Sequence, residues 1–329
     1  MPWPKISVVT PSFNQGQFLE QTIDSVLSQN YPNIEYFVVD GGSTDNSKAI
    51  IEKYAKHLTW WVSEKDNGQS HAINKGLKRA TGDIINWINS DDYYQPGALK
   101  TVAEKFQETG ATMISFRANV FGLQNRVSRG TDIFRNNLPK TLAYTRIDQP
   151  ETFFNRRAFE KMGLLNESLH YCMDKEWLLR YLLHFGQDGA INSDEVILNF
   201  RYHESSKSVS QQEGFQRESD AIYAEYASFL NRKKEADLLW KLSGKELSRR
   251  LVIPDTAVLA EFGKSMIHYY LFKRFMEEYD KLNRSSAEAL SEVLDVNLLN
   301  YEDAWLWKKY NNRLSLPSFL IRFARKFTR

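Results

Sequence analysis

Residues 34–46 read IEYFVVDGGSTDN, a mostly apolar run that ends in a polar turn, and this stretch decides the fold class. Strand-like runs at 6–10, 34–39, 60–63 and 83–88 alternate with helical patterns at 17–29, 47–54 and 70–80. Nearly continuous apolar strands separated by helices indicate a mostly parallel sheet with helices on both faces. We therefore expect an α/β domain at the start of the chain.

Polar segments directly follow the predicted strands, at 11–14, 40–45, 64–68 and 89–92. In an open α/β sheet, ligands bind at the carboxyl ends of the strands, so these segments should converge on one site. Turn formation alone would explain any one of them, because Asn, Asp, Gly and Ser all favour turns. Four such segments at the same edge favour a binding site.

The rest of the chain is expected to change character after His203. Before it, the pattern predicts a helix at 96–106, a hairpin of strands at 112–120 and around Arg126, and a loop at 138–146. After it, glycine is scarce, and apolar residues from Val258 to Met276 recur three or four apart, which predicts an amphipathic helix. We expect an α/β domain over residues 1–205 and a helical C-terminal extension over 206–329.

Composition places the chain in the ordinary globular class. Hydrophobic residues make up 42% and charged residues 26% of the 329 residues, and the net charge of +2 does not favour nucleic acid as a partner. The single cysteine, Cys172, excludes a disulfide framework. With no signal-peptide pattern and no run of 18 apolar residues, we expect a cytoplasmic location.

A series of motifs resembles those of the family 2 glycosyltransferases. They occur in order as VVTPSFN at 8–14, LSQNYPNIE at 27–35, VVDGGSTDNS at 38–47, DNG at 66–68, AINKG at 72–76, NSDD at 89–92 and QPETFF at 149–154. The resemblance covers roughly residues 5–205. It implies the GT-A fold and inverting transfer of a sugar from a nucleotide-diphosphate donor, UDP by family habit. The implied acceptor is a hydroxyl of a glycan or lipid-linked glycan, as in cell-surface polysaccharide or lipopolysaccharide synthesis.

The same resemblance implies a nucleotide-sugar pocket. Phe13 could stack on the base, and Asp40 could accept hydrogen bonds from uracil or ribose, although an aspartate there could also cap a turn. The family usually has an arginine where this chain has Ile73, so the diphosphate clamp is expected to use His71, Lys75 or a residue elsewhere. Lys75 is the candidate that we choose, and its alternative role is an exposed helix lysine. The residues assigned to the pocket are Thr10, Pro11, Phe13, Asn14, Asp40, Gly68, Asn74, Lys75 and Asp91.

Asp91 and Asp92 match the metal-binding DxD motif of the family, in which Asn89 replaces the first aspartate. Carboxylates suit Mn²⁺ or Mg²⁺, which would neutralise the departing diphosphate. Asn89 supplies no charge, so the division of roles between the two aspartates stays open, and a surface turn is the alternative. His203 is a third candidate ligand, or a structural histidine.

Asp174 aligns with the catalytic base of the family, although Met173 stands where the family usually has a glutamate. A base must be ionised near neutral pH and must take the proton of the acceptor hydroxyl as the new bond forms. The alternative for Asp174 is an N-cap of a helix. Glu176 is the second candidate for the base.

A nucleotidylyltransferase and a non-catalytic binding module remain as alternatives, and a dehydrogenase is excluded. A nucleotidylyltransferase would need a glycine-rich basic loop after the first strand, where this chain has PSFNQG at 11–16. A dehydrogenase would need GxGxxG there, and that motif is absent. A non-catalytic nucleotide-sugar-binding module would keep the nucleobase pocket and lose the metal ligands or the catalytic base. Asn89 and Met173 are small departures of this kind from the family motifs.

The C-terminal residues predict a basic amphipathic helix. Such a helix would suit peripheral contact with the inner face of a membrane. The alternative is a helix that packs on its own domain or on a second subunit of a homo-oligomer. The apolar positions are Leu316, Phe319, Leu320, Phe323 and Phe327, and the basic positions are Arg322, Arg325, Lys326 and Arg329.

Overall fold

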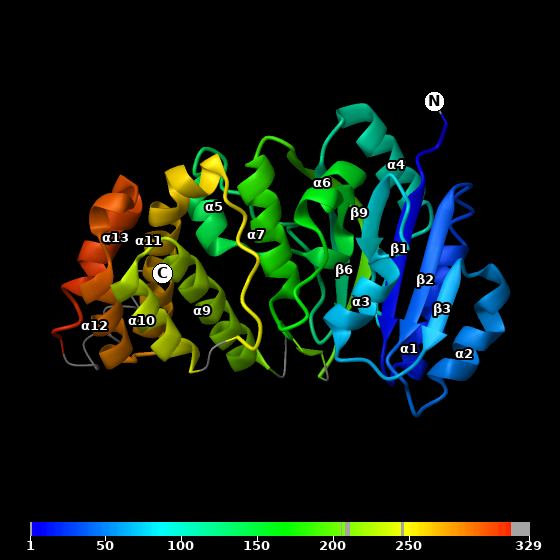
Figure 1. Cartoon of the computed structure of the whole chain (residues 1–329), viewed down its shortest axis with the longest axis horizontal. Coiled ribbons are helices and arrows are strands. Elements are labelled where there is room, and N and C mark those ends of the chain that lie inside the picture. The colour runs from blue at the N-terminus through cyan, green and yellow to red at the C-terminus, as the bar shows by residue number, and fades with distance from the viewer. Residues whose placement is uncertain (1, 205, 208–210, 245–246, 317–329) are drawn as a thin grey trace. The chain divides into compact units, whose positions relative to one another are not determined.

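A computed structural model of the chain describes residues 2–204, 206–207, 211–244 and 247–316 (Figure 1). The chain forms two compact units. The first comprises Met1–Asp132 and Arg146–Phe215, and the second comprises Ile133–Thr145 and Gln216–Arg329. Among the described residues, no helix is both long enough and apolar enough to cross a membrane.

The first unit is built on a mixed sheet whose N-terminal half is parallel, as the alternating pattern predicts. Strand β1 (Ile6–Ser12) lies between β2 (Ile34–Asp40) and β4 (Ile84–Trp87), and β3 (Trp60–Ser63) extends the parallel set beyond β2. The described strands of the sheet run in the order β3-β2-β1-β4-β8-β6-β9-β5. The remaining strands are β5 (Tyr93–Tyr94), β6 (Met113–Gly122), β7 (Arg126–Val127), β8 (Thr152–Asn155) and β9 (Ala190–Tyr202).

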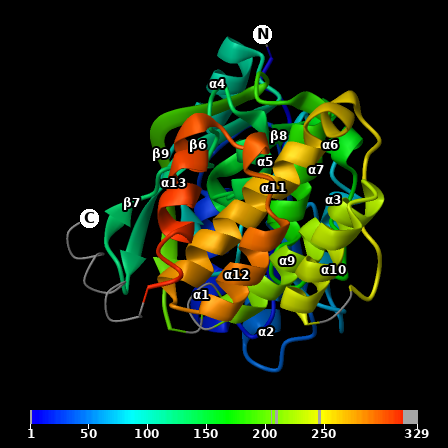
Figure 2. The ribbon, with the colours of Figure 1, turned by 90° about the vertical axis from the view of Figure 1, so that its left-hand side faces the viewer.

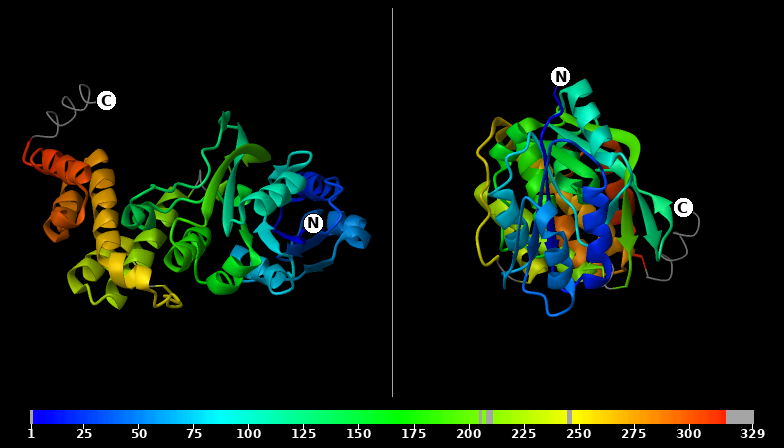
Figure 3. Two further views of the ribbon diagram at one scale, coloured as in Figure 1. Left: turned by 90° about the horizontal axis from the view of Figure 1, so that it is seen from above. Right: turned by 90° about the vertical axis from the view of Figure 1, so that its right-hand side faces the viewer.

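The second half of the sheet is where its direction changes. Strand β8 is antiparallel to both β4 and β6, whereas β9 runs parallel to β6 along most of its length (Figure 3). The predicted hairpin is confirmed, because β7 pairs antiparallel with β6. At the end of β6, a Cβ atom on Gly122 would lie 2.4 Å from the carbonyl oxygen of Tyr202, so this crossing requires glycine.

Helices cover both faces of the sheet, as the sequence predicts. Val8 and Val38 belong to a buried cluster with side chains of α1 (Gly16–Leu27), α2 (Ser47–Tyr54) and α4 (Ala98–Thr109). Val9 has the opposite orientation because side chains alternate along a strand, and it touches Gly76 of α3 (Gln69–Leu77).

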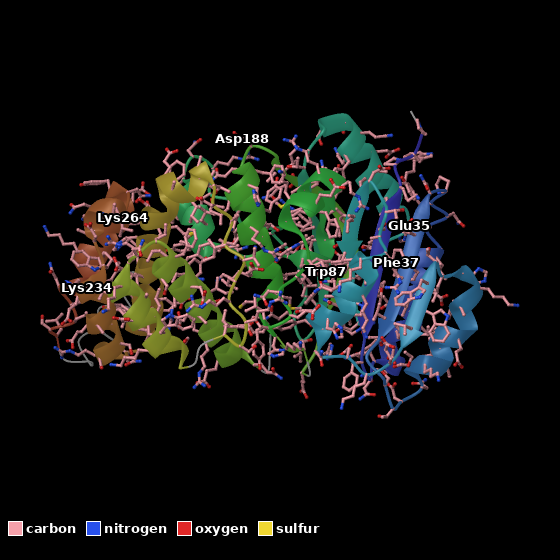
Figure 4. The ribbon with its side chains drawn as sticks, in the orientation of Figure 1. Glu35, Phe37, Trp87, Asp188, Lys234 and Lys264 are labelled. Carbon is pink, nitrogen blue, oxygen red and sulfur yellow. The ribbon has the colours of Figure 1, made fainter. Side chains whose placement is uncertain are left out.

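The second face also receives α6 (Arg156–Met162) and α7 (Met173–Phe185). Trp177 of α7 packs with its ring centre 5.2 Å from that of Trp87 and 4.7 Å from that of Phe154. Figure 4 labels Trp87 at the end of β4 and Phe37 on β2, and both are buried. The aromatic packing anchors α7 beside the carboxyl end of β4.

The second unit is helical and is built around α11 (Ala257–Asp280), in the middle of the yellow-to-red helices of Figure 2. The predicted helix is confirmed, but its burial is not one-sided, because every residue from Met266 to Phe272 is buried. Arg274 of this helix is buried and forms an ion pair with Asp220 at 2.9 Å inside the unit. The other helices are α9 (Gln212–Phe229), α10 (Lys233–Ser243), α12 (Arg284–Val293) and α13 (Tyr301–Asn311).

The expectation of a loop at 138–146 is wrong, because residues Leu138–Tyr144 form helix α5. The side chain of Asn137 caps this helix by accepting a hydrogen bond from the backbone of Lys140. Leu142 is fully buried, and the Tyr223 hydroxyl donates to the carbonyl oxygens of Leu142 and Ala143. A helix this short has a weak sequence pattern, and packing within the second unit stabilises it.

Candidate active site

A cleft of about 1070 Å³ opens in the first unit at the carboxyl ends of β1 to β4. Residues from all four predicted polar segments line it, together with parts of β6, β7, β9 and the first turn of α7. Of the residues proposed from sequence, the cleft is lined by Pro11, Phe13, Gly68, Asp91, Asp174 and His203. It is not lined by Thr10, Asn14, Asp40, Asn74, Lys75, Asp92 or Glu176.

Asp40 organises the turn that follows β2. Its carboxylate is fully buried and accepts hydrogen bonds from the backbone of Ser43 at 2.9 Å, from the backbone of Gly42 at 3.1 Å and from the Ser63 hydroxyl at 2.7 Å. The turn needs glycine at position 42, where φ is +82°. The structure therefore gives Asp40 the turn-capping contacts that were the alternative to a ligand contact.

Other polar residues that the sequence assigned to the pocket bond to neighbouring parts of the protein and do not line the cleft. Asn14 accepts a hydrogen bond from the backbone of Thr44 at 2.8 Å, which joins the loops after β1 and β2. Thr10 is buried against the Tyr36 hydroxyl at 2.9 Å. Asn74 exchanges hydrogen bonds with the backbone of Leu165 at 2.9 Å in both directions.

Side chains that reach the cleft from these loops include some that the sequence analysis did not select. Phe13 is 60% exposed, so its ring is available to a flat ligand. Asp66 lies over the loop after β2, where a Cβ atom on Gly41 would come within 2.7 Å of its Oδ2. Lys75 instead forms an ion pair with Glu64 at 2.8 Å, while Lys65 and Lys207 line the cleft.

The two aspartates after β4 have different surroundings. Asp91 lines the cleft, and its Oδ2 lies 3.0 Å from Nε2 of His203, which follows β9. Asp92 is buried and accepts a hydrogen bond from the backbone of Arg201 at 2.9 Å. Burial raises the pKa of Asp92 well above its usual range, and the negative charge of Asp91 raises it further. Geometry thus separates an acid that faces the cleft from one that faces the protein.

Arg201 is a residue that the sequence analysis missed, and it braces this acidic loop. Its Nε donates to the carbonyl oxygen of Asp91 at 3.1 Å, and its Nη2 donates to Gln21 of α1 at 2.7 Å. The guanidinium group lies 4.6 Å from the ring centre of Phe18 and 4.8 Å from that of Phe121. The loop is therefore held from α1 and β9 together, which no local pattern reveals.

The donor set around Asp91 fits a divalent cation that a ligand helps to hold. Among the described residues there is no cluster of three or more His, Cys, Asp or Glu side chains with the geometry of a metal site. Asp91 and His203 nevertheless bring a carboxylate and an imidazole within 3.0 Å of one another at the cleft. One or two protein ligands suffice when phosphate oxygens supply the rest, as is usual for Mg²⁺.

The two candidates for the catalytic base differ in their access to the cleft. Asp174 is half-buried in the first turn of α7 and lines the cleft. Glu176 is 1% exposed and forms an ion pair with Arg180 at 2.8 Å, away from the cleft lining. Burial raises the pKa of Glu176, and Arg180 opposes that shift. Only Asp174 of this pair can reach a molecule in the cleft.

The far part of the cleft lies beyond the loops of β1 to β4, and the sequence analysis assigned no individual residue to it. It is formed by the 3₁₀ turn η2 (Gln149–Glu151) and by residues of β6 and β7. Gln149 donates from Nε2 to the carbonyl oxygen of Trp87 at 2.8 Å, which places η2 beside the end of β4. Arg126, Ser128 and Glu151 line this part.

The first half of the sheet is parallel, and a cleft large enough for a nucleotide opens at its strand ends beside the acidic loop and His203. These features are typical of the class of GT-A glycosyltransferases. The family model for glycosyl transferase family 2 matches residues 7–185, which is more than half of the chain. The chain therefore belongs to glycosyl transferase family 2, and it is a glycosyltransferase.

Several bacterial proteins resemble the chain to different extents. An uncharacterized glycosyltransferase of Nostoc is 36% identical over 106 residues, covering 31% of this chain and 33% of that protein. An uncharacterized glycosyltransferase of Rickettsia typhi is 22% identical over 286 residues, covering 84% and 83%. The putative teichuronic acid biosynthesis glycosyltransferase TuaG of Bacillus subtilis is 36% identical over 110 residues, covering 32% and 43%. The match thus spans a third of the Nostoc protein and under half of TuaG.

Solved structures confirm the fold. The crystal structure of residues 1–349 of TarS from S. aureus in complex with UDP has a TM-score of 0.58 at 17% identity, covering 89% of this chain and 82% of that one. A mannosyltransferase of Pyrobaculum calidifontis, in complex with GDP-Man and Mn²⁺, has a TM-score of 0.50 at 16% identity, covering 99% and 90%. The GT-A fold expected from the motifs is confirmed.

Proposed function

We propose that this chain is an inverting, metal-dependent glycosyltransferase that moves a sugar from a UDP-linked donor to a hydroxyl of a glycan or lipid-linked glycan. The observation that carries the proposal is the cleft that holds Phe13, Asp91, His203 and Asp174 together at the strand ends. TarS in complex with UDP supports the UDP-linked donor, the mannosyltransferase in complex with GDP-Man and Mn²⁺ supports a nucleotide-sugar donor and a metal, and TuaG of teichuronic acid biosynthesis supports the pathway. Cell-surface polysaccharide synthesis is the process that we propose for it.

The proposed donor site uses the loops after β1 to β3. Phe13 stacks on the base, because it is an exposed ring on the wall of the cleft. Asp66 accepts hydrogen bonds from the nucleoside, while Asp40 keeps the turn in shape through its own hydrogen bonds. Lys65 and Lys207 replace Lys75 as the basic groups for the diphosphate, since both line the cleft and Lys75 does not.

Asp91 and His203 are the proposed ligands of Mn²⁺ or Mg²⁺. When bound, the cation neutralises charge on the departing diphosphate. Asp91 contributes the negative charge that attracts it, and the neighbouring imidazole contributes a neutral nitrogen ligand that suits Mn²⁺ better than Mg²⁺. Asp92 shapes the loop from behind through its hydrogen bond to the backbone of Arg201.

Asp174 is the proposed general base. It lies at the N-terminal end of α7, where the helix dipole stabilises a carboxylate. The carboxylate takes the proton of the acceptor hydroxyl as that oxygen forms its bond to the sugar, which allows a single displacement with inversion. Met173 beside it supplies no charge, so the base acts without the adjacent acid that the family motif usually has.

The acceptor proposal includes peripheral contact with a membrane. The predicted C-terminal amphipathic helix falls on residues 316–329, and 317–329 lie outside the described part of the chain. Those 13 residues carry Arg322, Arg325, Lys326 and Arg329 and no acidic residue. Such a segment suits an anionic inner leaflet, where a lipid-linked glycan would be presented.

A donor screen tests the proposed function. The purified full-length chain is incubated with UDP-, GDP- and dTDP-sugars in the presence of Mn²⁺ or EDTA, and release of the nucleoside diphosphate is measured. We expect slow metal-dependent hydrolysis of at least one UDP-sugar, and thermal stabilisation by the same compound, because a ligand that binds only the folded state raises its stability. A folded protein that binds and hydrolyses no nucleotide-sugar contradicts the proposal, and binding without any turnover would identify a non-catalytic module.

A further inference from the structure

Glu151, in η2, is a buried acid that faces the far part of the cleft. Glu151 is 2% exposed and belongs to the cleft lining. Its Oε1 accepts a hydrogen bond from the Ser128 hydroxyl at 2.6 Å. Among the described residues, no other residue donates a hydrogen bond to its Oε2. Oε2 is not one of the fully buried atoms that lack a partner, so it is open to the cleft, where a ligand can contact it.

The local hydrogen bonds determine which oxygen is available. Ser128 accepts a hydrogen bond from the backbone of Ala118 at 2.9 Å, so its own proton points to Oε1 of Glu151. Burial and the nearby Asp148 carboxylate together raise the pKa of Glu151 to about 8, against the smaller lowering effects of the hydrogen bonds from Ser128 and from its own backbone and of the charge of Arg146. At neutral pH the carboxyl group is therefore mostly protonated.

The place of η2 in the sheet indicates what could meet this oxygen. Through the hydrogen bond from Gln149 to the carbonyl oxygen of Trp87, η2 lies beside the strand that leads into Asn89 and Asp91. Glu151 is also close enough to Asp92 for their charges to interact. A sugar attached to a diphosphate at the acidic loop, or a glycan approaching Asp174, would lie next to η2 in the same cleft.

We propose that Glu151 forms a sugar-binding subsite, in which its carboxyl group exchanges hydrogen bonds with a sugar hydroxyl through Oε2 while Ser128 holds Oε1. This inference rests on the proposed function, because it takes the cleft to hold a nucleotide-sugar and a glycan. The hydroxyl belongs to the transferred sugar of the donor or to the acceptor glycan, and both present the same chemistry. A neutral acid suits a neutral polyol, since it can donate and accept without bringing a second charge into the site.

Two substitutions test the subsite. Glu151→Gln keeps the shape and an N–H donor in place of the O–H. The double variant S128A/E151L removes both side chains of the Ser128–Glu151 hydrogen bond, and because the backbone N–H of Ala118 then loses its acceptor, the folding of this variant is checked first. The matched control is Glu35→Gln, since Glu35 also accepts a hydrogen bond from a serine, Ser7 at 2.7 Å, but does not line the cleft.

The measurements are the dissociation constants of UDP and of UDP-GlcNAc or another hydrolysed UDP-sugar, the KM of donor hydrolysis, and the KM of the acceptor in transfer. We expect S128A/E151L to weaken one sugar-dependent constant by about 10-fold while the affinity for UDP changes less than twofold, and E151Q to recover most of the loss. A change in UDP-sugar affinity assigns the hydroxyl to the donor, and a change in acceptor KM alone assigns it to the acceptor.

The subsite is overturned if the folded double variant keeps every sugar-dependent constant within twofold of the wild type. It is also overturned if UDP itself weakens equally, because Glu151 would then only shape the loop. If the double variant fails to fold, E151Q in place of it decides by the same constants at pH 9, where the wild-type acid is ionised and the amide is not. A wild type that binds no UDP-sugar refutes the proposed function instead.

Discussion

At the scale of single residues, the separation of Asp91 from Asp92 has the most direct consequence. Asp91 faces the cleft beside His203, and Asp92 is buried behind the loop. We expect Asp91→Asn to lose at least about 100-fold in metal-dependent turnover with an unchanged melting temperature, because the carboxylate that attracts the cation is gone. Mn²⁺ binding followed by electron paramagnetic resonance should weaken in parallel.

Asp92→Asn is the matched comparison for that variant. In the wild type, the Asp92 side chain accepts a hydrogen bond from the backbone of Arg201, and its pKa is raised. Asparagine therefore puts a neutral amide of the same shape in place of a carboxyl group that already resists ionisation. It should therefore keep more activity than Asp91→Asn. Full activity of Asp91→Asn, or full activity of the wild type in EDTA, contradicts the assignment of the metal site.

The base assignment leads to a second prediction at this scale. Asp174→Asn keeps size and hydrogen bonding but cannot take a proton, so kcat should fall by about 10²–10⁴-fold. Donor affinity, measured by calorimetry, should stay within a few fold, because the carboxylate acts on the acceptor hydroxyl. Glu176→Gln is a comparison with a different expected result, since it breaks the buried ion pair to Arg180 and should lower the melting temperature. Near wild-type kcat in Asp174→Asn would refute the assignment.

At the scale of secondary-structure elements, Arg201 joins the end of β9 to α1 and to the acidic loop. Arg201→Met removes the hydrogen bonds to the Asp91 carbonyl and to Gln21 and the guanidinium contacts with the Phe18 and Phe121 rings, but it keeps an apolar side chain at this position. We expect the Mn²⁺ concentration for half-maximal activity to rise about 10-fold, as the loss of a charge-assisted hydrogen bond predicts.

The positioning role of Arg201 has its own checks. Arg201→Lys keeps the charge and one donor and should recover part of the effect, since the planar fork of the guanidinium is lost. Direct Mn²⁺ binding should weaken in Arg201→Met without loss of helix content by circular dichroism. If metal affinity and KM both stay at wild-type values, Arg201 contributes only to packing.

The short helix α5 is the second element with a testable consequence. Leu142 is fully buried in the helical unit, so Leu142→Ala should lower the free energy of unfolding by about 2–5 kcal/mol, measured by urea denaturation. Arg135→Ala, at an exposed position of the same segment, is the control and should change stability by less than about 0.5 kcal/mol. A surface loop at 138–146 would instead tolerate both substitutions.

At the scale of the whole molecule, the prediction concerns the C-terminal segment. Deleting residues 317–329 removes four basic residues, each worth about 1 kcal/mol near an anionic surface. We expect the shortened chain to lose co-sedimentation with vesicles that contain phosphatidylserine while it keeps transfer to a soluble acceptor. The charge variant R322Q/R325Q/K326Q should behave in the same way. Unfolding or dissociation of the shortened chain would show that the segment packs on protein.

The sequence predicts which loops form the site much better than it predicts which side chains of those loops face the cleft. The four polar segments meet at the cleft because the carboxyl ends of parallel strands share one edge. Asp40 and Asn74 fit the same family motifs, but in the structure Asp40 accepts hydrogen bonds within its own turn and Asn74 bonds to the backbone of Leu165. Spacing could not show this, because a motif contains residues that shape a loop as well as residues that face the ligand.

The sequence by itself determined the α/β order, the parallel first half of the sheet, the hairpin and the long helix near the C-terminus. These follow from periodicity and turn residues, which act over a few positions along the chain. Only the tertiary structure decided which of two adjacent aspartates faces the cleft, that Arg201 holds their loop, and that residues 138–144 form a helix. Each of those outcomes depends on partners far away in sequence, as in the hydrogen bond to Asp92 from a backbone 109 positions distant. Local patterns carry no record of such partners, because folding alone brings them together.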